Sequence, residues 1–348
     1  MTTQTSSPTI AVYGATGHTG SYLLADLHRR GITPILVGRN ADRMRAAAVA
    51  ADLPDAEIRV ADLADHAALV AAFTGADAVI SSLSAYVRNG EPVLAAAIAA
   101  GAHYTDISGE QLFLKKVFDG YDAPAEKAGV TVLSGITDNN VAGDLLAHLV
   151  ARRVNGPAEI VVSHLSKSRG NGSKGSAKTV FASLDWFRDG GWHYADGNLE
   201  TGYTARHSEM TYPGDSAPTP VGRFPQPPVL TIPRHTEVAS VEGVLAADIL
   251  GTLGSFTEEL IEQIPDEPSS DLRYEVIVDA HAGSRVVRGV VEGVDSYRDS
   301  ALLAVEIATR LAAGATKPGA LAPAEAFEPT EFLDALARFG ITWRIEES

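Results

Sequence analysis

The sequence predicts an α/β protein in which a parallel β-sheet with helices on both faces is followed by a second α+β domain. Three observations lead to this prediction. Short apolar runs alternate with amphipathic segments through residues 1–154, which is typical of a parallel sheet. A glycine-rich turn separates the first predicted strand from the first helix. After residue 155, longer runs with strand-like alternation predict a mainly antiparallel second sheet.

The glycine-rich turn is Y-G-A-T-G-H-T-G at residues 13–20, directly after a β-branched run at residues 9–12. Gly14 allows a sharp turn, Gly17 allows the backbone to approach a diphosphate, and Gly20 allows the helix to pack closely. The free amides of a helix N-terminus favour an anion there. The turn predicts a Rossmann-type dinucleotide-binding domain, and the alternative is a tight turn without a ligand. The predicted cofactor contacts in the turn are Gly14, Thr16, Gly17, His18, Thr19 and Gly20.

The second predicted strand, at residues 34–37, leads to Arg39, Asn40 and, one helical turn later, Arg43. In a dinucleotide-binding domain this strand ends beside the adenosine ribose, where an acidic residue would accept a hydrogen bond from the 2′-hydroxyl. Here a guanidinium takes that place, and it suits a 2′-phosphate. The sequence therefore favours NADP(H) over NAD(H), unless both arginines are simply solvated residues at a helix start.

The third predicted strand, at residues 58–60, is followed by Asp62 and Leu63. The Asp62 carboxylate is positioned to accept a hydrogen bond from the adenine amino group, and we expect Leu63 beside it. The alternative for Asp62 is a turn residue without a ligand.

The fourth predicted strand, at residues 76–82, ends in small polar residues. Ligands of open parallel sheets bind beyond the carboxyl ends of the strands. We therefore expect Ser82 and Leu83 on the nicotinamide side of the cofactor, with Tyr86 at the rim as a candidate catalytic residue. The alternative for Tyr86 is an exposed loop tyrosine.

The fifth predicted strand ends in the run Y-T-D-I-S-G-E at residues 104–110, after an alanine-rich helix at residues 92–100. Asp106 and Glu110 are either carboxylates facing the substrate or cap and first-turn acids of the next helix. A sixth strand at residues 130–133 and a polar turn at residues 134–140 complete the alternation.

The second domain begins with a predicted strand at residues 159–166 and a basic, glycine-rich turn at residues 167–174. In so acidic a protein this turn is a second candidate anion site, with Arg169 and Lys174 as substrate-binding residues. The alternative is an ordinary surface loop.

The remaining segments complete the predicted domain organisation of residues 1–154, 155–295 and 296–348. We expect the last segment to pack back on the first domain. The other expected elements are a surface meander or lid at 189–233, a helix at 244–260, a hairpin of strands 272–280 and 284–294, helices at 297–313 and 331–339, and a strand-like end.

Composition narrows the class of protein. The 348 residues are 45% hydrophobic and 21% charged, with a net charge of −16, which disfavours nucleic acid and acidic membranes as partners. There is no cysteine, so disulfides and thiolate metal sites are excluded. The histidines show no metal-ligand spacing, so no metal is expected. Residues 1–8 lack the basic and apolar regions of a signal peptide, and we expect a cytoplasmic location.

Taken together, these motifs resemble the saccharopine dehydrogenase-like oxidoreductases, in particular the bacterial group that includes the trans-acting enoyl reductases. The resemblance extends over most of the chain, although the turn at residues 135–143 departs from that group. The motifs that carry it are G-A-T-G-H-T-G at 14–20, V-G-R-N at 37–40, A-G-A-H-Y-T-D-I-S-G-E at 100–110, T-I-P-R-H at 231–235 and P-A-E-A-F-E-P-T-E-F-L at 323–333.

The resemblance implies an NADP(H)- or NAD(H)-dependent oxidoreductase whose second domain supports a homodimer. Hydride transfer to a C=N or C=C bond of a small molecule is the expected reaction, because the nicotinamide supplies the chemistry and the protein positions the acceptor. Alternatives are an NADP-binding redox sensor without turnover and a nucleotide-dependent non-redox enzyme such as an epimerase. Candidate proton donors are Tyr86, Asp106, Glu110 and His193.

Overall fold

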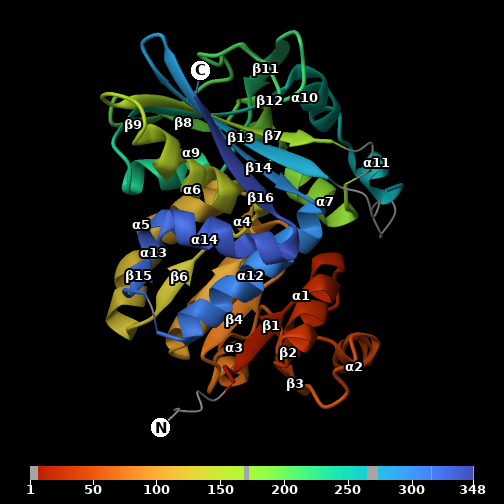
Figure 1. Cartoon of the computed structure of the whole chain (residues 1–348). Coiled ribbons are helices and arrows are strands. Elements are labelled where there is room, and N and C mark those ends of the chain that lie inside the picture. Colours follow the sequence, from red (N-terminus) through yellow and green to blue (C-terminus); the bar gives the residue numbers. More distant parts are fainter. Residues whose placement is uncertain (1–6, 168–171, 265–272, 315, 348) are drawn as a thin grey trace. The chain divides into compact units, whose positions relative to one another are not determined.

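The structure, a computed structural model, describes residues 7–167, 172–264, 273–314 and 316–347 (Figure 1). The chain forms two compact units, each assembled from separate segments. The first unit contains residues 1–108, 116–136 and 300–321, and the second contains 109–115, 137–299 and 322–348. The fold class predicted from the sequence is confirmed, since the first unit holds a parallel sheet and the second a mostly antiparallel one.

The parallel sheet of the first unit has seven strands in the order β15-β6-β5-β4-β1-β2-β3. Its six N-terminal strands are those predicted from the apolar runs. The seventh strand, β15, comes from the C-terminal part of the chain and pairs with β6. Because it has only two residues, it has no recognisable strand pattern in the sequence. The strands are β1 Ile10–Tyr13, β2 Ile35–Gly38, β3 Glu57–Val60, β4 Ala78–Ser81, β5 His103–Asp106, β6 Thr131–Leu133 and β15 Gly319–Ala320.

Helices join these parallel strands, as crossover connections require. The fourth helix begins at Tyr86, six residues before the predicted start, and therefore contains Pro92. Its first turn follows Ala85, which has a φ of 51° and reverses the chain directly after β4. The helices of this alternation are α1 His18–Arg29, α2 Ala41–Ala50, α3 His66–Phe73, α4 Tyr86–Ala99, α5 Gln111–Ala128 and, later in the chain, α12 Ser296–Ala312.

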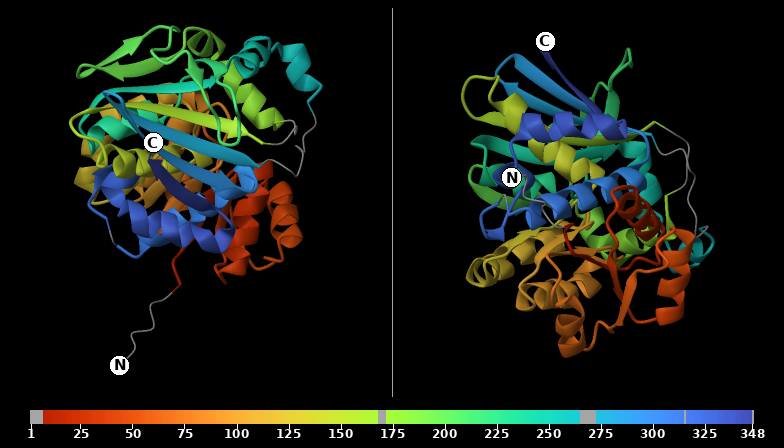
Figure 2. Two further views of the ribbon diagram at one scale, coloured as in Figure 1. Left: turned by 45° about the horizontal axis from the view of Figure 1, so that its top comes forward. Right: turned by 60° about the horizontal axis from the view of Figure 1, so that its bottom comes forward.

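The second unit contains a nine-stranded sheet with the main order β10-β11-β12-β7-β13-β14-β16 (Figure 2). Strands β12 and β7 are parallel, and the other pairs are antiparallel. The predicted hairpin is β13 and β14, with Gly283 in a left-handed conformation at its turn. The strands are β7 Ala158–Ser166, β8 Trp192–Ala195, β9 Asn198–Thr201, β10 Glu209–Met210, β11 Thr219–Arg223, β12 Val238–Ala246, β13 Tyr274–Ala282, β14 Arg285–Gly293 and β16 Thr342–Glu347.

Three predictions for this part of the chain were wrong in detail. The segment 189–233 is not a loose meander, because it contributes β8 to β11 to the sheet. Residues 244–246 end strand β12, so the predicted helix starts only at residue 247. The C-terminal strand β16 pairs with β14 of the second sheet, and only residues 300–321 join the first unit.

The helices of the second unit are mostly short. The predicted helices over 244–260 and 331–339 are each divided into shorter pieces. Their bounds are α6 Asp138–Ala151, α7 Lys174–Ala182, α8 Leu184–Arg188, α9 Pro228–Thr231, η1 Ile232–Arg234, α10 Ala247–Gly254, α11 Glu258–Glu262, α13 Pro323–Ala326, α14 Pro329–Ala335 and η2 Leu336–Phe339.

Helix α6 packs on β13 and β14 and thus groups with the second unit, whereas the sequence analysis placed the first domain boundary after it, at residue 154. Gly289 of β14 faces this helix, because a Cβ atom there would lie 3.0 Å from Leu146. A second apolar cluster lies on the same sheet around Val161, Val244 and Val290.

Candidate functional site

A groove of about 390 Å³ lies in the first unit at the carboxyl ends of β1 to β4. The strand order reverses between β1 and β4, and a crevice at such a point is the usual ligand site of open α/β sheets (Figure 1). The groove is lined by Tyr13, Gly14, Ala15, Thr16, Gly17, Val37, Gly38, Arg39, Asn40, Arg43, Met44, Asp62, Leu63, Ser82, Leu83, Ser84 and Asn89.

The glycine-rich turn forms one wall of the groove, and each glycine meets a different constraint. Gly14 has a φ of 94°, and a Cβ atom there would lie 2.1 Å from the carbonyl oxygen of Ser82. A Cβ atom on Gly20 would lie 2.6 Å from the Ala15 carbonyl group. At Gly17 the protein leaves room, since the nearest atom would be 3.6 Å away. The close packing of the fold therefore requires glycine at positions 14 and 20, whereas Gly17 leaves space in the groove.

Helix α1 begins at this wall without a capping side chain, and Gly17 is its N-cap residue with φ −89° and ψ 173°. The uncapped first turn directs amide groups towards the groove, the arrangement that binds phosphate in dinucleotide-binding domains. His18 stacks edge-on against Tyr22, and His18, Thr19 and Gly20 are not among the residues that line the groove.

The other end of the groove is basic. Arg39 and Arg43 both line it, and neither forms an ion pair within the described part of the chain. Asn40 caps helix α2, its Oδ1 accepting a hydrogen bond from the backbone N–H of Arg43 at 2.9 Å. Asp62 also lines the groove, and its Oδ1 accepts from the backbone N–H of Ala64 at 3.0 Å, as expected of a turn residue. Its contact with adenine stays a prediction.

Ser82, Leu83, Ser84 and Asn89 line the groove beyond β4. The loop is held by Tyr86, whose hydroxyl donates to the Ser81 carbonyl at 2.7 Å and accepts from the Leu83 N–H at 2.9 Å. Tyr86 is 2% exposed, and burial together with the charge of Asp106 raises the pKa of its hydroxyl. The expectation of Tyr86 at an exposed rim is therefore wrong, because the early start of α4 turns the ring into the protein.

Asp106 is fully buried at the end of β5. Its Oδ1 accepts from the backbone N–H groups of Ser108 at 2.9 Å and Gly135 at 3.0 Å, and its carbonyl accepts from Ile136 at 2.6 Å. Burial raises the pKa of the Asp106 carboxyl, although these amide donors act in the opposite direction. Asp106 is thus neither exposed to substrate nor a helix cap. Its hydrogen bonds instead stabilise the loops that follow β5 and β6.

The two other candidate acids lie in the second unit. Glu110 is buried immediately before α5. His193 lies in β8, where its Nδ1 is 2.8 Å from Nη1 of Arg223 and its Nε2 is 3.4 Å from Glu200. Burial and the charge of Arg223 lower the pKa of His193. Among the residues described, neither of these side chains lines the groove of the first unit.

The described lysines in and beside the basic turn predicted to bind an anion lie near acidic residues. Lys174 and Lys178 both lie near Glu262, at 3.5 and 3.8 Å, and Lys167 pairs with Glu275 at 3.0 Å. The sequence pattern did not reveal these acids because they lie about a hundred residues further along the chain. Arg169 lies outside the described residues.

Sequence reasoning missed several groove residues, among them Tyr13, Met44 and Asn89. Tyr13 ends β1, and its pKa is raised by burial and by Asp62. Asn89 lies in the first turn of α4, where its side chain donates to the Ser84 carbonyl at 2.9 Å. The sequence analysis starts this helix at Pro92, which leaves Asn89 in the preceding loop. Asn89 was therefore not identified as a groove residue.

The parallel sheet, the glycine-rich turn and the groove define a dinucleotide-binding domain of the dehydrogenase class. Residues 10–133 match the family described as the saccharopine dehydrogenase NADP-binding domain. Over this segment the chain is similar to that family, in agreement with the predicted resemblance and with NADP(H) as the cofactor.

Two curated relatives are similar to less than half of the chain. A lipid droplet localized protein of Caenorhabditis elegans is 30% identical over 44% of this chain and 38% of its own length. A trans-acting enoyl reductase of Mycobacterium ulcerans is 31% identical over 45% of this chain and 39% of its own length. The chain thus spans about two fifths of each of these relatives.

A solved structure extends the comparison to both units. Saccharopine dehydrogenase (L-Glu forming) from Saccharomyces cerevisiae matches 98% of this chain and 100% of its own, with a TM-score of 0.62 and 13% identity. At this identity the match establishes a shared fold.

Two further features concern the part of the chain that the structure describes. No helix there combines the length and apolar character needed to cross a membrane. No group of three potential metal-binding side chains is present among them.

Proposed function

We propose that this protein is an NADPH-dependent oxidoreductase that reduces a C=N or C=C bond of a small molecule by hydride transfer. The observation that carries the proposal is the groove itself, which joins an uncapped helix N-terminus at Gly17 to a pair of arginines at Arg39 and Arg43. A diphosphate and a 2′-phosphate would occupy these two positions. The nicotinamide, when bound, supplies the hydride, and the protein orients it.

In this proposal each part of the groove has a separate role. The amides after Gly14 and Gly17 hold the diphosphate, and the arginines hold the 2′-phosphate. Asp62 and Leu63 border the adenine, and Ser82, Leu83, Ser84 and Asn89 border the nicotinamide. Tyr86 and Asp106 are positioning residues, because each fixes backbone groups of the loops beyond β4, β5 and β6.

The proton donor is proposed separately from these positioning residues. Glu110 and His193 stay candidates for it. A carboxyl or imidazole group is chemically suited to give a proton to the reduced carbon or nitrogen. Lys174 and Arg169 remain candidate contacts for an acidic substrate, although Glu262 already neutralises part of the charge at Lys174.

A homodimer formed through the second unit and a cytoplasmic location are further parts of the proposal. The first is what the family resemblance implies, and the second is the expectation drawn from the sequence.

The decisive experiment measures NADPH oxidation against panels of imines and of α,β-unsaturated carbonyl compounds. A reductase should oxidise NADPH in proportion to the product formed with at least one acceptor. Tight NADPH binding without turnover of any acceptor would instead support a redox sensor, and failure to bind NADPH would refute both.

A further inference from the structure

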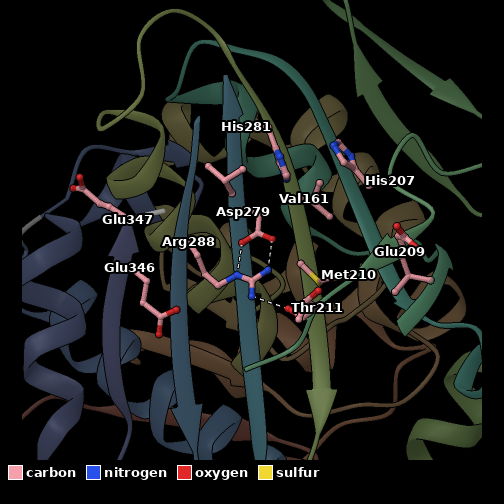
Figure 3. Close-up of a pocket in the computed structure, with 12 residues that line it drawn as sticks. Val161, His207, Glu209, Met210, Thr211, Asp279, His281, Arg288, Glu346 and Glu347 are labelled. Carbon is pink, nitrogen blue, oxygen red and sulfur yellow. Dashed lines mark hydrogen bonds and ion pairs between the residues drawn. The ribbon is translucent and has the colours of Figure 1, made fainter. Parts of the chain in front are cut away.

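A second cavity, of about 470 Å³, lies in the second unit on one face of the mixed sheet (Figure 3). The opposite face is covered by α6, which Gly289 approaches closely. Because side chains alternate along a strand, the neighbouring Arg288 points away from α6 and into the cavity. Asp279 and His281 lie opposite Arg288 and Val286 in the hairpin register and share this face.

The cavity has an apolar part and a charged part. Val161, Met210, Val221 and Val286 supply apolar wall. Four carboxylates and one guanidinium also line it, so the lining carries a formal charge of −3 with both histidines neutral. These charged residues are Glu209, Asp279, Glu346, Glu347 and Arg288.

The basic groups at the cavity are already engaged. Arg288 forms two hydrogen bonds of 2.6 Å with Asp279, and its third nitrogen donates to the Thr211 carbonyl at 2.6 Å (Figure 3). The His207 ring lies 2.8 Å from Glu242, and this hydrogen bond raises the pKa of His207 despite burial. An anionic ligand would therefore have to displace a buried partner at either group.

Three of the four carboxylates at the cavity pair with arginines, namely Asp279 with Arg288, Glu346 with Arg344 and Glu347 with Arg285. Two other acceptors of the lining are not engaged. Glu209 is exposed and forms no ion pair within the described part of the chain. His281 stacks on His207 with ring centroids 4.5 Å apart, and its ring nitrogens have no hydrogen-bond partner among the described residues. Burial and the neighbouring His207 lower the pKa of His281, so its ring is neutral and offers an acceptor nitrogen.

We propose that this cavity binds a small organic cation, with an ammonium or guanidinium head directed to Glu209 and His281 and a short apolar chain against Val161 and Val221. Ammonium and guanidinium groups carry only donors, and the cavity presents unused acceptors and engaged donors. This site belongs to the second unit alone, and it does not depend on the proposed reductase activity.

NMR of the isotopically labelled 348-residue chain, titrated with n-butylammonium and n-butylguanidinium, tests the proposal. Butyrate and 1-butanol serve as probes of equal chain length that are anionic and neutral. We expect saturable shifts at residues of β10, β13 and β14 with the cations. Equal binding of butyrate, or the absence of saturable shifts with both cations, would overturn the proposal.

Two variants locate the ligand. Glu209→Gln should weaken cation binding by about fivefold to tenfold, because a charge-assisted hydrogen bond becomes a neutral one. The matched control Glu258→Gln, on α11 and outside the cavity lining, should bind the cation as the parent does. Val286→Phe should fill the apolar part and reduce binding further. The fluorescence of Trp186, Trp192 and Trp343, which all belong to the second unit, reports that the variants are folded. An unchanged cation affinity in both Glu209→Gln and Val286→Phe would refute the assignment.

Discussion

A Cβ atom on Gly14 would lie 2.1 Å from the carbonyl oxygen of Ser82. The ends of β1 and β4 therefore approach each other so closely that only glycine fits between them. This approach forms the floor of the groove at the point where the strand order reverses. Gly17, three residues later, has no such close contact within the protein. A substitution at Gly14 should therefore affect folding, whereas one at Gly17 should affect ligand binding.

Gly17→Val should abolish NADPH binding while the protein stays folded. Its side chain fits the backbone conformation but takes the space proposed for the diphosphate. We expect the affinity to fall by at least about 100-fold, measured by calorimetric titration. Gly20→Ala is the contrasting variant, and overpacking against Ala15 should lower its unfolding free energy by about 1–3 kcal/mol. Unchanged affinity in Gly17→Val would refute the phosphate assignment.

Arg39→Ala should remove most of the preference for NADPH over NADH. The parent should bind NADPH at least about tenfold more tightly, because a guanidinium pairs with the 2′-phosphate. Arg45 lies on the same helix as Arg43 but outside the groove lining, so Arg45→Ala is the matched control. Competition titrations with both coenzymes measure the ratio, and equal affinities in the parent would contradict the proposed 2′-phosphate contact.

Tyr86→Phe should lower the unfolding free energy by about 1–3 kcal/mol, because the Leu83 amide loses its buried acceptor. If Tyr86 only positions the loop, the variant keeps the pH profile of turnover and changes chiefly the KM for NADPH. Thermal unfolding and steady-state kinetics measure these effects. A lost limb of the pH profile would instead identify Tyr86 as the proton donor.

His235 should make the second unit more stable in mild acid. Burial acts to lower the pKa of His235, but the Asp144 carboxylate, 2.8 Å away, outweighs burial and raises it. A raised pKa in the folded state means that this stabilisation is complete below the unfolded value of about 6.5 and is lost as the pH rises through the folded value. The cost of His235→Gln should therefore be largest near pH 6 and shrink above pH 7.

Tryptophan fluorescence during urea unfolding can measure this effect, because Trp186, Trp192 and Trp343 all belong to the second unit. His193→Gln provides the opposite sign, since the pKa of His193 is lowered and its contribution is lost as the pH falls. A pH-independent cost of His235→Gln would show that its pair with Asp144 is not charged.

Local sequence signals were sufficient for the first six strands of the first unit and for most of its groove. The glycine spacing at 14, 17 and 20, the short apolar strands and Arg39 after the second strand each depend on neighbouring residues only. The structure brings the residues predicted from them, among them Gly14, Arg39, Asp62 and Ser82, to one groove. A parallel sheet does this regularly, because it places the carboxyl ends of its strands at one edge.

Only the tertiary structure decided the rest, because it depends on partners far apart in the chain. Residues 244–246 are predicted as the start of a helix but end strand β12, which pairs with β7, and β15 becomes a strand only beside β6. Tyr86 and Asp106 look like exposed polar residues, yet backbone groups of adjacent loops bury and bind them. Glycine turns and the periodic spacing of apolar residues depend on residues that are neighbours in the sequence. Burial and charge pairing depend instead on surfaces that come into contact only when the chain folds.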